Sequence, residues 1–183
     1  MRKILIAGCF ALMLHAEIVD RLAITVDHES ITELQLDEEL RVTAFLNNQP
    51  VSRTVGARRA AADRLIEQLL IEREIELSRF PEPGPKDVKS YIGQVQSTYG
   101  APDRFQNLLR QYDLTENALD EHLKRQLTIL RFVEYRFRTA VLTAPDRSSP
   151  QGLSDEQMDE ALAAWLEESR KQVNIVYIDK SLQ

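Results

Sequence analysis

The chain has 183 residues, of which 43% are hydrophobic, and its formal net charge is −6 at pH 7. This length and apolar fraction allow one ordinary globular domain with a real core. The negative charge argues against nucleic acid or an anionic membrane surface as the main partner.

The first sixteen residues predict a secretory signal peptide. Two basic residues precede an almost entirely apolar run from Ile4 to Leu14, which is too short to span a bilayer comfortably. The small Ala16 suits cleavage before Glu17. The alternative is that residues 1–16 form a buried strand or helix of the domain.

The only cysteine, Cys9, lies inside this apolar run, so a mature chain that begins near Glu17 would contain none. Such a chain suits an oxidising compartment, and it excludes a disulfide framework and thiol catalysis alike. The sequence Ile6-Ala7-Gly8-Cys9 resembles a bacterial lipobox, which leaves a lipid anchor on Cys9 as an alternative.

Alternating residues from Ile18 to Val26 predict a half-buried strand, and a polar turn follows at residues 27–30. Thr32 with Gln35 forms a capping box. It opens a helix that is expected to end at Asn47-Asn48, before a proline.

Three helices are predicted next. The first runs from about Thr54 to Phe80, carries a long apolar stripe and ends at the proline-rich segment 81–85. The second has Pro85 in its first turn and fades at Tyr99-Gly100. The third is a short helix from Pro102 to about Tyr112-Asp113.

A second long helix is expected to start at Thr115-Glu116. The stripe that we expect to be buried consists of Leu119, Leu123, Leu127, Leu130, Val133 and Phe137. The opposite face predicts ion pairs between residues four apart, namely Asp120 with Lys124, Glu121 with Arg125 and Glu134 with Arg138. These pairs indicate a solvated face.

Residues 139–153 are rich in proline, serine and glycine and predict a linker. Ser154 with Gln157 then forms a second capping box, which opens a helix. The apolar face of this helix consists of Met158, Ala161, Leu162, Trp165 and Leu166.

After this helix the period changes to two, and Val173 to Ile178 predicts a strand. A lone strand leaves its backbone groups without partners, so we predict that it pairs with Leu22 to Val26. We also predict that Trp165 and Leu162 pack among the first helices. The expected fold is mainly α, with a small β-ribbon formed by the N-terminal and C-terminal strands.

No catalytic or metal-binding pattern is apparent in the sequence. His15, His28 and His122 each lack a second ligand at metal spacing and are expected to be ordinary surface residues. The carboxylate pairs Glu38-Glu39 and Glu167-Glu168 are expected on solvated helix faces. We therefore expect no enzymatic activity, no cofactor and no metal, and we expect some of the apolar and aromatic stripes to line a groove.

Several segments resemble the SurA-type periplasmic chaperones. Val19 to Asp27, followed by Ile31-Thr32-Glu33-Leu34, resembles the opening of that family, and Ala62 to Ile71 is similar to the long second helix of its N-terminal domain. Ala163 to Arg170, with the strand after it, resembles the C-terminal helix and strand that return to this domain. The turn after the first strand lacks the glycine often found there, which leaves the hairpin register open.

The resemblance implies that residues 17–138 form a SurA-like N-terminal helical domain, which residues 154–183 complete. In the family, parvulin-type prolyl isomerase domains usually stand between these parts. Here only residues 139–153 do, and they have neither the length nor the histidines of such a domain. Isomerase activity is therefore not expected.

The resemblance thus implies a periplasmic, ATP-independent chaperone that lacks the parvulin domain and binds unfolded outer-membrane or secreted proteins. The candidate groove residues are Phe45, Tyr91, Phe105, Tyr112, Phe132 and Tyr135. One alternative is a peptidyl-prolyl isomerase or a non-catalytic subunit of one. Another is a structural module whose groove is filled by its own second copy, as a homodimer.

Overall fold

The computed structural model describes residues 20–143 and 154–183, and the side chains of the first range up to residue 137. The predictions for the signal peptide, the cleavage site, the lipid anchor on Cys9 and the first two residues of the N-terminal strand lie outside these ranges. Within them, the fold is mainly α with a small antiparallel sheet, as the sequence predicts.

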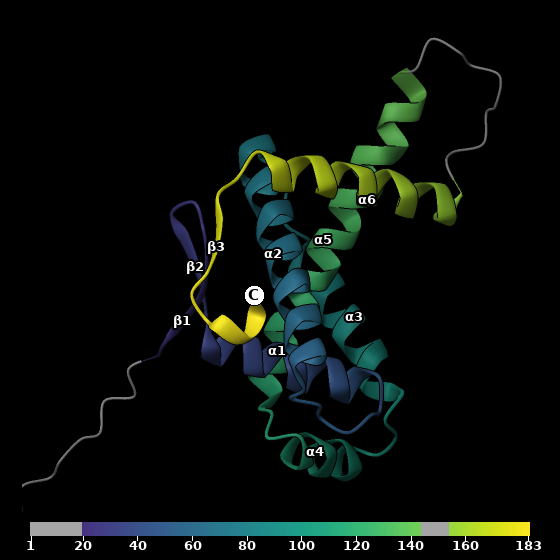
Figure 1. Cartoon of the computed structure of the whole chain (residues 1–183). Coiled ribbons are helices and arrows are strands. Elements are labelled where there is room, and N and C mark those ends of the chain that lie inside the picture. The colour runs from purple at the N-terminus through teal and green to yellow at the C-terminus, as the bar shows by residue number, and fades with distance from the viewer. Residues whose placement is uncertain (1–19, 144–153) are drawn as a thin grey trace, which may run out of the picture.

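The described residues form two groups of elements, which residues 144–153 separate along the chain (Figure 1). The first group consists of β1 (Leu22–Val26), β2 (Glu29–Thr32), α1 (Glu33–Leu46), α2 (Val55–Ser78), α3 (Pro85–Ser97), α4 (Pro102–Gln111) and α5 (Glu116–Thr143). The second consists of α6 (Asp155–Lys171), β3 (Ile175–Tyr177) and the 3-10 turn η1 (Lys180–Leu182). Helix α6 lies across α2 and α5 (Figure 1), and its Arg170 reaches Asp63 and Glu67 of α2.

The sheet has the order β2-β1-β3. The predicted pairing of the N-terminal and C-terminal strands is confirmed, because Ile24 lies opposite Tyr177 and Val26 lies opposite Ile175. Strand β3 covers only the middle of the predicted segment 173–178. The ribbon also has a third strand, since the segment predicted as a turn contributes β2.

The turn between β1 and β2 is therefore shorter than predicted and centres on Asp27. Its φ of 54° is left-handed, a conformation that aspartate tolerates better than most residues. The Asp27 carboxylate accepts hydrogen bonds from the backbone N–H of Asn174, at 2.8 Å, and from Arg73, at 2.8 Å. These contacts lower the pKa of Asp27 and hold it in this turn.

The predicted helix starts agree with the structure. Thr32 with Gln35 and Ser154 with Gln157 both form complete capping boxes, and Pro85 occupies the first turn of α3. One helix end differs, because α5 continues to Thr143, inside the predicted linker. Residues 138–144 contain no glycine or proline that would end the helix earlier, and the ring of Pro145 disfavours helical conformation in the residue before it.

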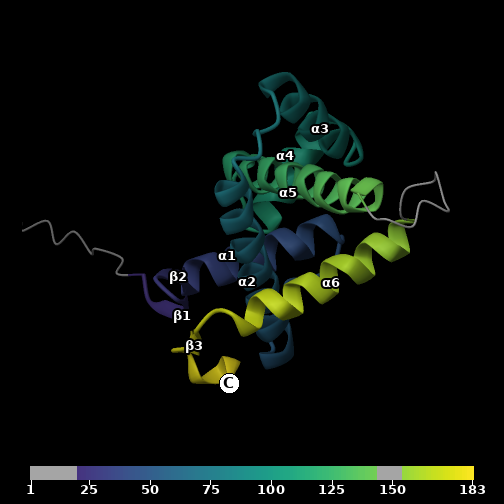
Figure 2. The same cartoon turned by 90° about the horizontal axis from the view of Figure 1, so that it is seen from above.

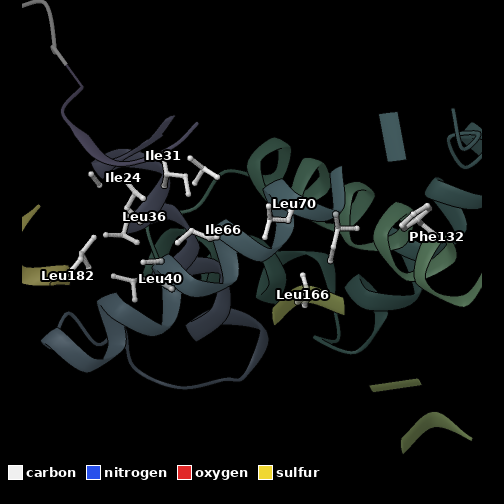
Figure 3. Packing of buried hydrophobic residues seen from close by; sticks show 14 residues of the cluster. Ile24, Ile31, Leu36, Leu40, Ile66, Leu70, Phe132, Leu166 and Leu182 are labelled. Atoms are coloured by element: carbon white, nitrogen blue, oxygen red, sulfur yellow. The ribbon is translucent and has the colours of Figure 1, made fainter. Parts of the chain in front are cut away.

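The larger hydrophobic core joins the two ends of the chain. It contains side chains of the sheet, α1, α2, α5, α6 and η1 (Figure 3), including Ile24, Leu36, Ile66, Phe132, Leu166 and Leu182. The prediction for the closing helix is confirmed in that Leu162 and Trp165 pack, half-buried, against this core. The C-terminal residues thus complete the core that the N-terminal strand begins.

A second core lies where the C-terminal half of α1 meets α3, α4 and the start of α5. Its buried members include Phe45, Phe105, Leu109, Leu119 and Leu123. Helix α1 connects the two cores, since Leu36 and Leu40 belong to the first and Val42 and Phe45 to the second.

The predicted apolar stripe of α5 is correct only in its first half. Leu119, Leu123 and Leu127 are buried, whereas Leu130 is 59% exposed and Phe132 is buried instead. The buried face rotates because α5 passes from the second core to the first, where α2 and α6 cover a different side of it.

Two of the three predicted ion pairs within α5 are replaced by pairs to other segments, and the third, Glu134 with Arg138, includes a side chain outside the described residues. Arg125 lies 3.0 Å from Glu72 of α2, and Lys124 lies 3.5 Å from Glu82 of the loop before α3. Glu121 and Arg125 are nevertheless exposed, as expected of a solvated face.

Candidate peptide-binding surface

Four of the predicted groove residues belong to the second core. The Phe45 ring stacks on Tyr99 with ring centroids 4.6 Å apart, and it meets the edges of Phe105 at 6.2 Å and Tyr112 at 5.6 Å. Phe45, Phe105 and Tyr112 are buried, and Tyr91 packs half-buried beside them. We call Phe45, Tyr99, Phe105 and Tyr112 the aromatic cluster.

The other two predicted residues lie on α5, around Phe80. The Phe80 ring centroid is 5.5 Å from that of Phe132 and 5.3 Å from that of Tyr135. Phe132 is buried in the first core, whereas Tyr135 is 57% exposed. The six residues therefore do not line one groove. Each group also contains one aromatic residue that was not predicted: Tyr99 in the first and Phe80 in the second. They follow the ends of α3 and α2, where helical periodicity gives no signal.

An open hollow of about 460 Å³ lies between α2 and α6. The apolar part of its lining, which we call its floor, comes from α6 alone: Leu166 is buried, Leu162 half-buried and Ala163 exposed. The sequence reasoning missed this hollow, because its two walls stand about a hundred residues apart along the chain. An apolar floor open to solvent suits an apolar side chain of another polypeptide.

The rim of the α2–α6 hollow is charged. Arg170 donates hydrogen bonds to Asp63 Oδ1 at 3.1 Å and to Glu67 Oε1 at 3.2 Å, which fastens α6 to α2. Asp159 and Glu167 complete the acidic side. The rim gives the apolar floor a water-soluble border.

A smaller hollow of about 280 Å³ lies between α2 and α5. Ile75 and Ile129 contribute its apolar surface, and four glutamates surround them. Burial raises the pKa of one of these, Glu72, despite the neighbouring Arg125. Because it is smaller than the α2–α6 hollow, it accommodates less of an apolar segment.

Glu39 is the most buried charged side chain among the described residues, which corrects the prediction that it lies on a solvated face. It is 4% exposed and accepts hydrogen bonds from Arg64 Nε at 2.6 Å and from Thr43 Oγ1 at 3.0 Å. His122, predicted at the surface, is only 8% exposed, and its Nδ1 lies 3.9 Å from Glu39. Burial lowers the pKa of His122, which keeps its ring neutral near pH 7.

The contacts among Glu39, Arg64 and His122 favour a structural role for these residues. They tie α1, α2 and α5 together between the two cores. No three His, Asp or Glu side chains of residues 20–137 and 154–183 are grouped so that they could hold a metal ion.

In the described part of the chain, every helix is too short or too polar to cross a membrane.

Comparison with known proteins adds no family assignment: no protein-family model matches this chain, and no curated protein matches it in sequence.

Proposed function

We propose that this chain is an ATP-independent chaperone that binds unfolded outer-membrane or secreted proteins in the periplasm. The observation that carries the proposal is the α2–α6 hollow, an apolar floor left open to solvent on the surface of a packed domain. The resemblance of the N-terminal and C-terminal segments to the SurA-type chaperones supports the same proposal.

The size and border of the hollow suit a holdase. A volume of about 460 Å³ accommodates one or two side chains of an extended segment. Binding at such a site is weak and reversible, because the client loses conformational entropy when it is ordered. The acidic surface keeps the complex in solution while the apolar segment is covered.

Two neighbouring alanines on α6 provide a test with a matched control. Ala163 lines the hollow and Ala164 does not, and both are exposed. Ala163→Glu introduces a carboxylate into the apolar floor and should weaken suppression of aggregation of an unfolded β-barrel protein by about tenfold, whereas Ala164→Glu should leave it unchanged. Light scattering during dilution of the client from denaturant measures the effect.

Three outcomes would contradict the proposal. The first is that the unsubstituted protein fails to suppress aggregation. The second is acceleration of a proline-limited refolding phase, which would favour the prolyl isomerase alternative. The third is a tight dimer that is indifferent to client, which would favour a self-associating structural module.

A further inference from the structure

The charged residues around the α2–α6 hollow are mostly acidic. Four of its five charged lining residues are carboxylates, namely Asp63, Glu67, Asp159 and Glu167, and the fifth is Arg170. Helix α6 lies along one margin of the molecule, on the opposite side of α5 from α3 (Figure 2), and its Asp159 and Glu167 are exposed. A surface that combines apolar contact area with excess negative charge attracts a cationic partner.

At one end of the hollow, the chain itself provides the cations. The guanidinium of Arg170 donates to Asp63 Oδ1 at 3.1 Å, to the Asp63 carbonyl oxygen at 3.2 Å and to Glu67 Oε1 at 3.2 Å. The ammonium of Lys171 lies 3.3 Å from Glu167. Three of the four carboxylates therefore already have a cationic partner within the chain.

Asp159, at the other end of the hollow, differs from these three. Among the described residues, none forms a hydrogen bond or an ion pair with its side chain. Asp155 and Glu156 lie in the first turn of α6, where a carboxylate stabilises the helix through its dipole. Asp159 lies beyond that turn, where the effect has fallen off. Its charge is therefore available to a binding partner.

The positions of Asp159 and the apolar floor match the spacing of an extended polypeptide. Asp159 precedes Ala163 by four residues, which is about 6 Å along the helix axis. In an extended segment, side chains two positions apart lie on the same face and about 6.6 Å apart. A segment that lies along α6 with an apolar side chain on Ala163 therefore brings the side chain two positions away to Asp159. A Lys or Arg at that position forms an ion pair, whereas an Asp or Glu is repelled.

We propose that the α2–α6 hollow selects unfolded segments in which a Lys or Arg stands two positions from an apolar residue. The apolar side chain covers Leu162, Ala163 and Leu166, and the cation pairs with Asp159. This proposal rests on the proposed chaperone function and names the class of segment that the same site takes. Apolar contact provides most of the affinity and charge provides the selection, because an exposed ion pair contributes little on its own.

Fluorescence anisotropy with two unstructured peptides tests the selection. Both are Ser- and Gly-rich and carry the same rhodamine label, and they differ only in ending the pattern Leu-x-Leu-x-Lys or Leu-x-Leu-x-Glu. The Lys peptide should bind about tenfold tighter at low salt, and the ratio of the two affinities should fall as NaCl is raised to about 0.5 M, since salt screens exposed charges. Equal affinities at low salt would overturn the proposal.

Two neighbouring carboxylates on α6 distinguish a local effect from the net charge of the protein. Asp159 lines the hollow and Glu160 does not, and both are exposed. Asp159→Lys should lower the ratio of the two affinities at least about fivefold, whereas Glu160→Lys, which changes the net charge equally, should lower it less than about twofold. Equal losses in the two variants would show that the overall charge makes the selection, and would refute the role given to the hollow.

The result is separable from the test of the chaperone function. A protein that suppresses aggregation of the β-barrel client, and loses this in Ala163→Glu, but binds the two peptides equally would keep the proposed function and refute the selection. Selective binding that depends on Asp159, by a protein that does not suppress aggregation, would do the reverse. Sedimentation velocity checks for a second copy in the hollow: a dimer that Ala163→Glu disrupts and that binds neither peptide would overturn the selection in favour of self-association.

Discussion

The carboxylate of Glu39 is buried, and a cationic side chain pairs with it. Arg64 of α2 donates a hydrogen bond from Nε to Glu39 Oε1 at 2.6 Å, so the two side chains form an ion pair. Arg64→Met keeps much of the aliphatic stem but leaves the buried charge without its ion-pair partner.

We expect Arg64→Met to lower the free energy of unfolding by about 2 kcal/mol, since it leaves a buried charge-assisted hydrogen bond unmade. Urea denaturation measures the change. Arg59→Met on the same helix, where the side chain is exposed, should cost less than about 0.5 kcal/mol. Equal effects of the two substitutions would contradict the role given to Glu39.

His122 makes stability depend on pH. Burial is the main cause of its lowered pKa; the charges of Arg125 and Arg64 lower it further, and Glu39 opposes them. Because the ordinary pKa is 6.5, the unfolded chain takes up a proton at this residue before the folded chain does. The stability that neutral His122 provides is therefore present above pH 6.5 and is lost as pH falls below it.

The urea midpoint should consequently decrease between about pH 7 and pH 5, and His122→Gln should reduce this decrease. The carboxylates with lowered pKa values, Asp27, Asp37 and Asp179, contribute a separate loss at more acidic pH, where they become protonated in the folded protein. For Asp179 the pKa is about 2, so its contribution lies well below this window. An identical pH profile for the His122→Gln variant would show that His122 is not the sensor.

At the scale of elements, α6, β3 and η1 act as one closing segment. Leu166 and Leu182 fill the first core, and β3 pairs with β1 along one edge. Arg58 adds an ion pair to Asp179 at 2.6 Å, which anchors η1 to the start of α2. The N-terminal elements thus depend on residues at the other end of the chain.

Deletion of residues 154–183 should unfold the domain. Each of the two leucines contributes about 1.5–3 kcal/mol of burial, and loss of the whole segment removes a large part of the 5–15 kcal/mol that is typical of a domain. Differential scanning calorimetry should show no cooperative transition in the truncated chain. A truncated chain that keeps its cooperative melt would show that the closing segment is dispensable.

Local signals made several elements predictable. Capping at Thr32 and Ser154 depends on residues three apart, and the alternation in β1 and β3 indicates that each needs a partner. Strand β2 gives no such signal, because only Ile31 of its four residues is buried. The rotation of the buried face of α5 depends on where α2 and α6 cross it, which no local pattern encodes.

At the scale of the whole molecule, the candidate site was harder to predict than the fold. An aromatic residue on a helical stripe has the same spacing whether a neighbouring helix or solvent faces it, and Phe45 and Tyr135 are opposite examples. The α2–α6 hollow depends on the angle at which two distant helices meet. Its floor residues were predicted only as members of the apolar face of a closing helix.

The position of β1 in the middle of the sheet has a consequence for biosynthesis. A ribosome produces β1 and β2 long before Tyr177, which pairs with Ile24. Until then one edge of the nascent hairpin has unpaired backbone groups, which are open to strand addition from other chains. Completion of the sheet therefore has to wait until β3 has been made, and the hairpin is prone to aggregation before then.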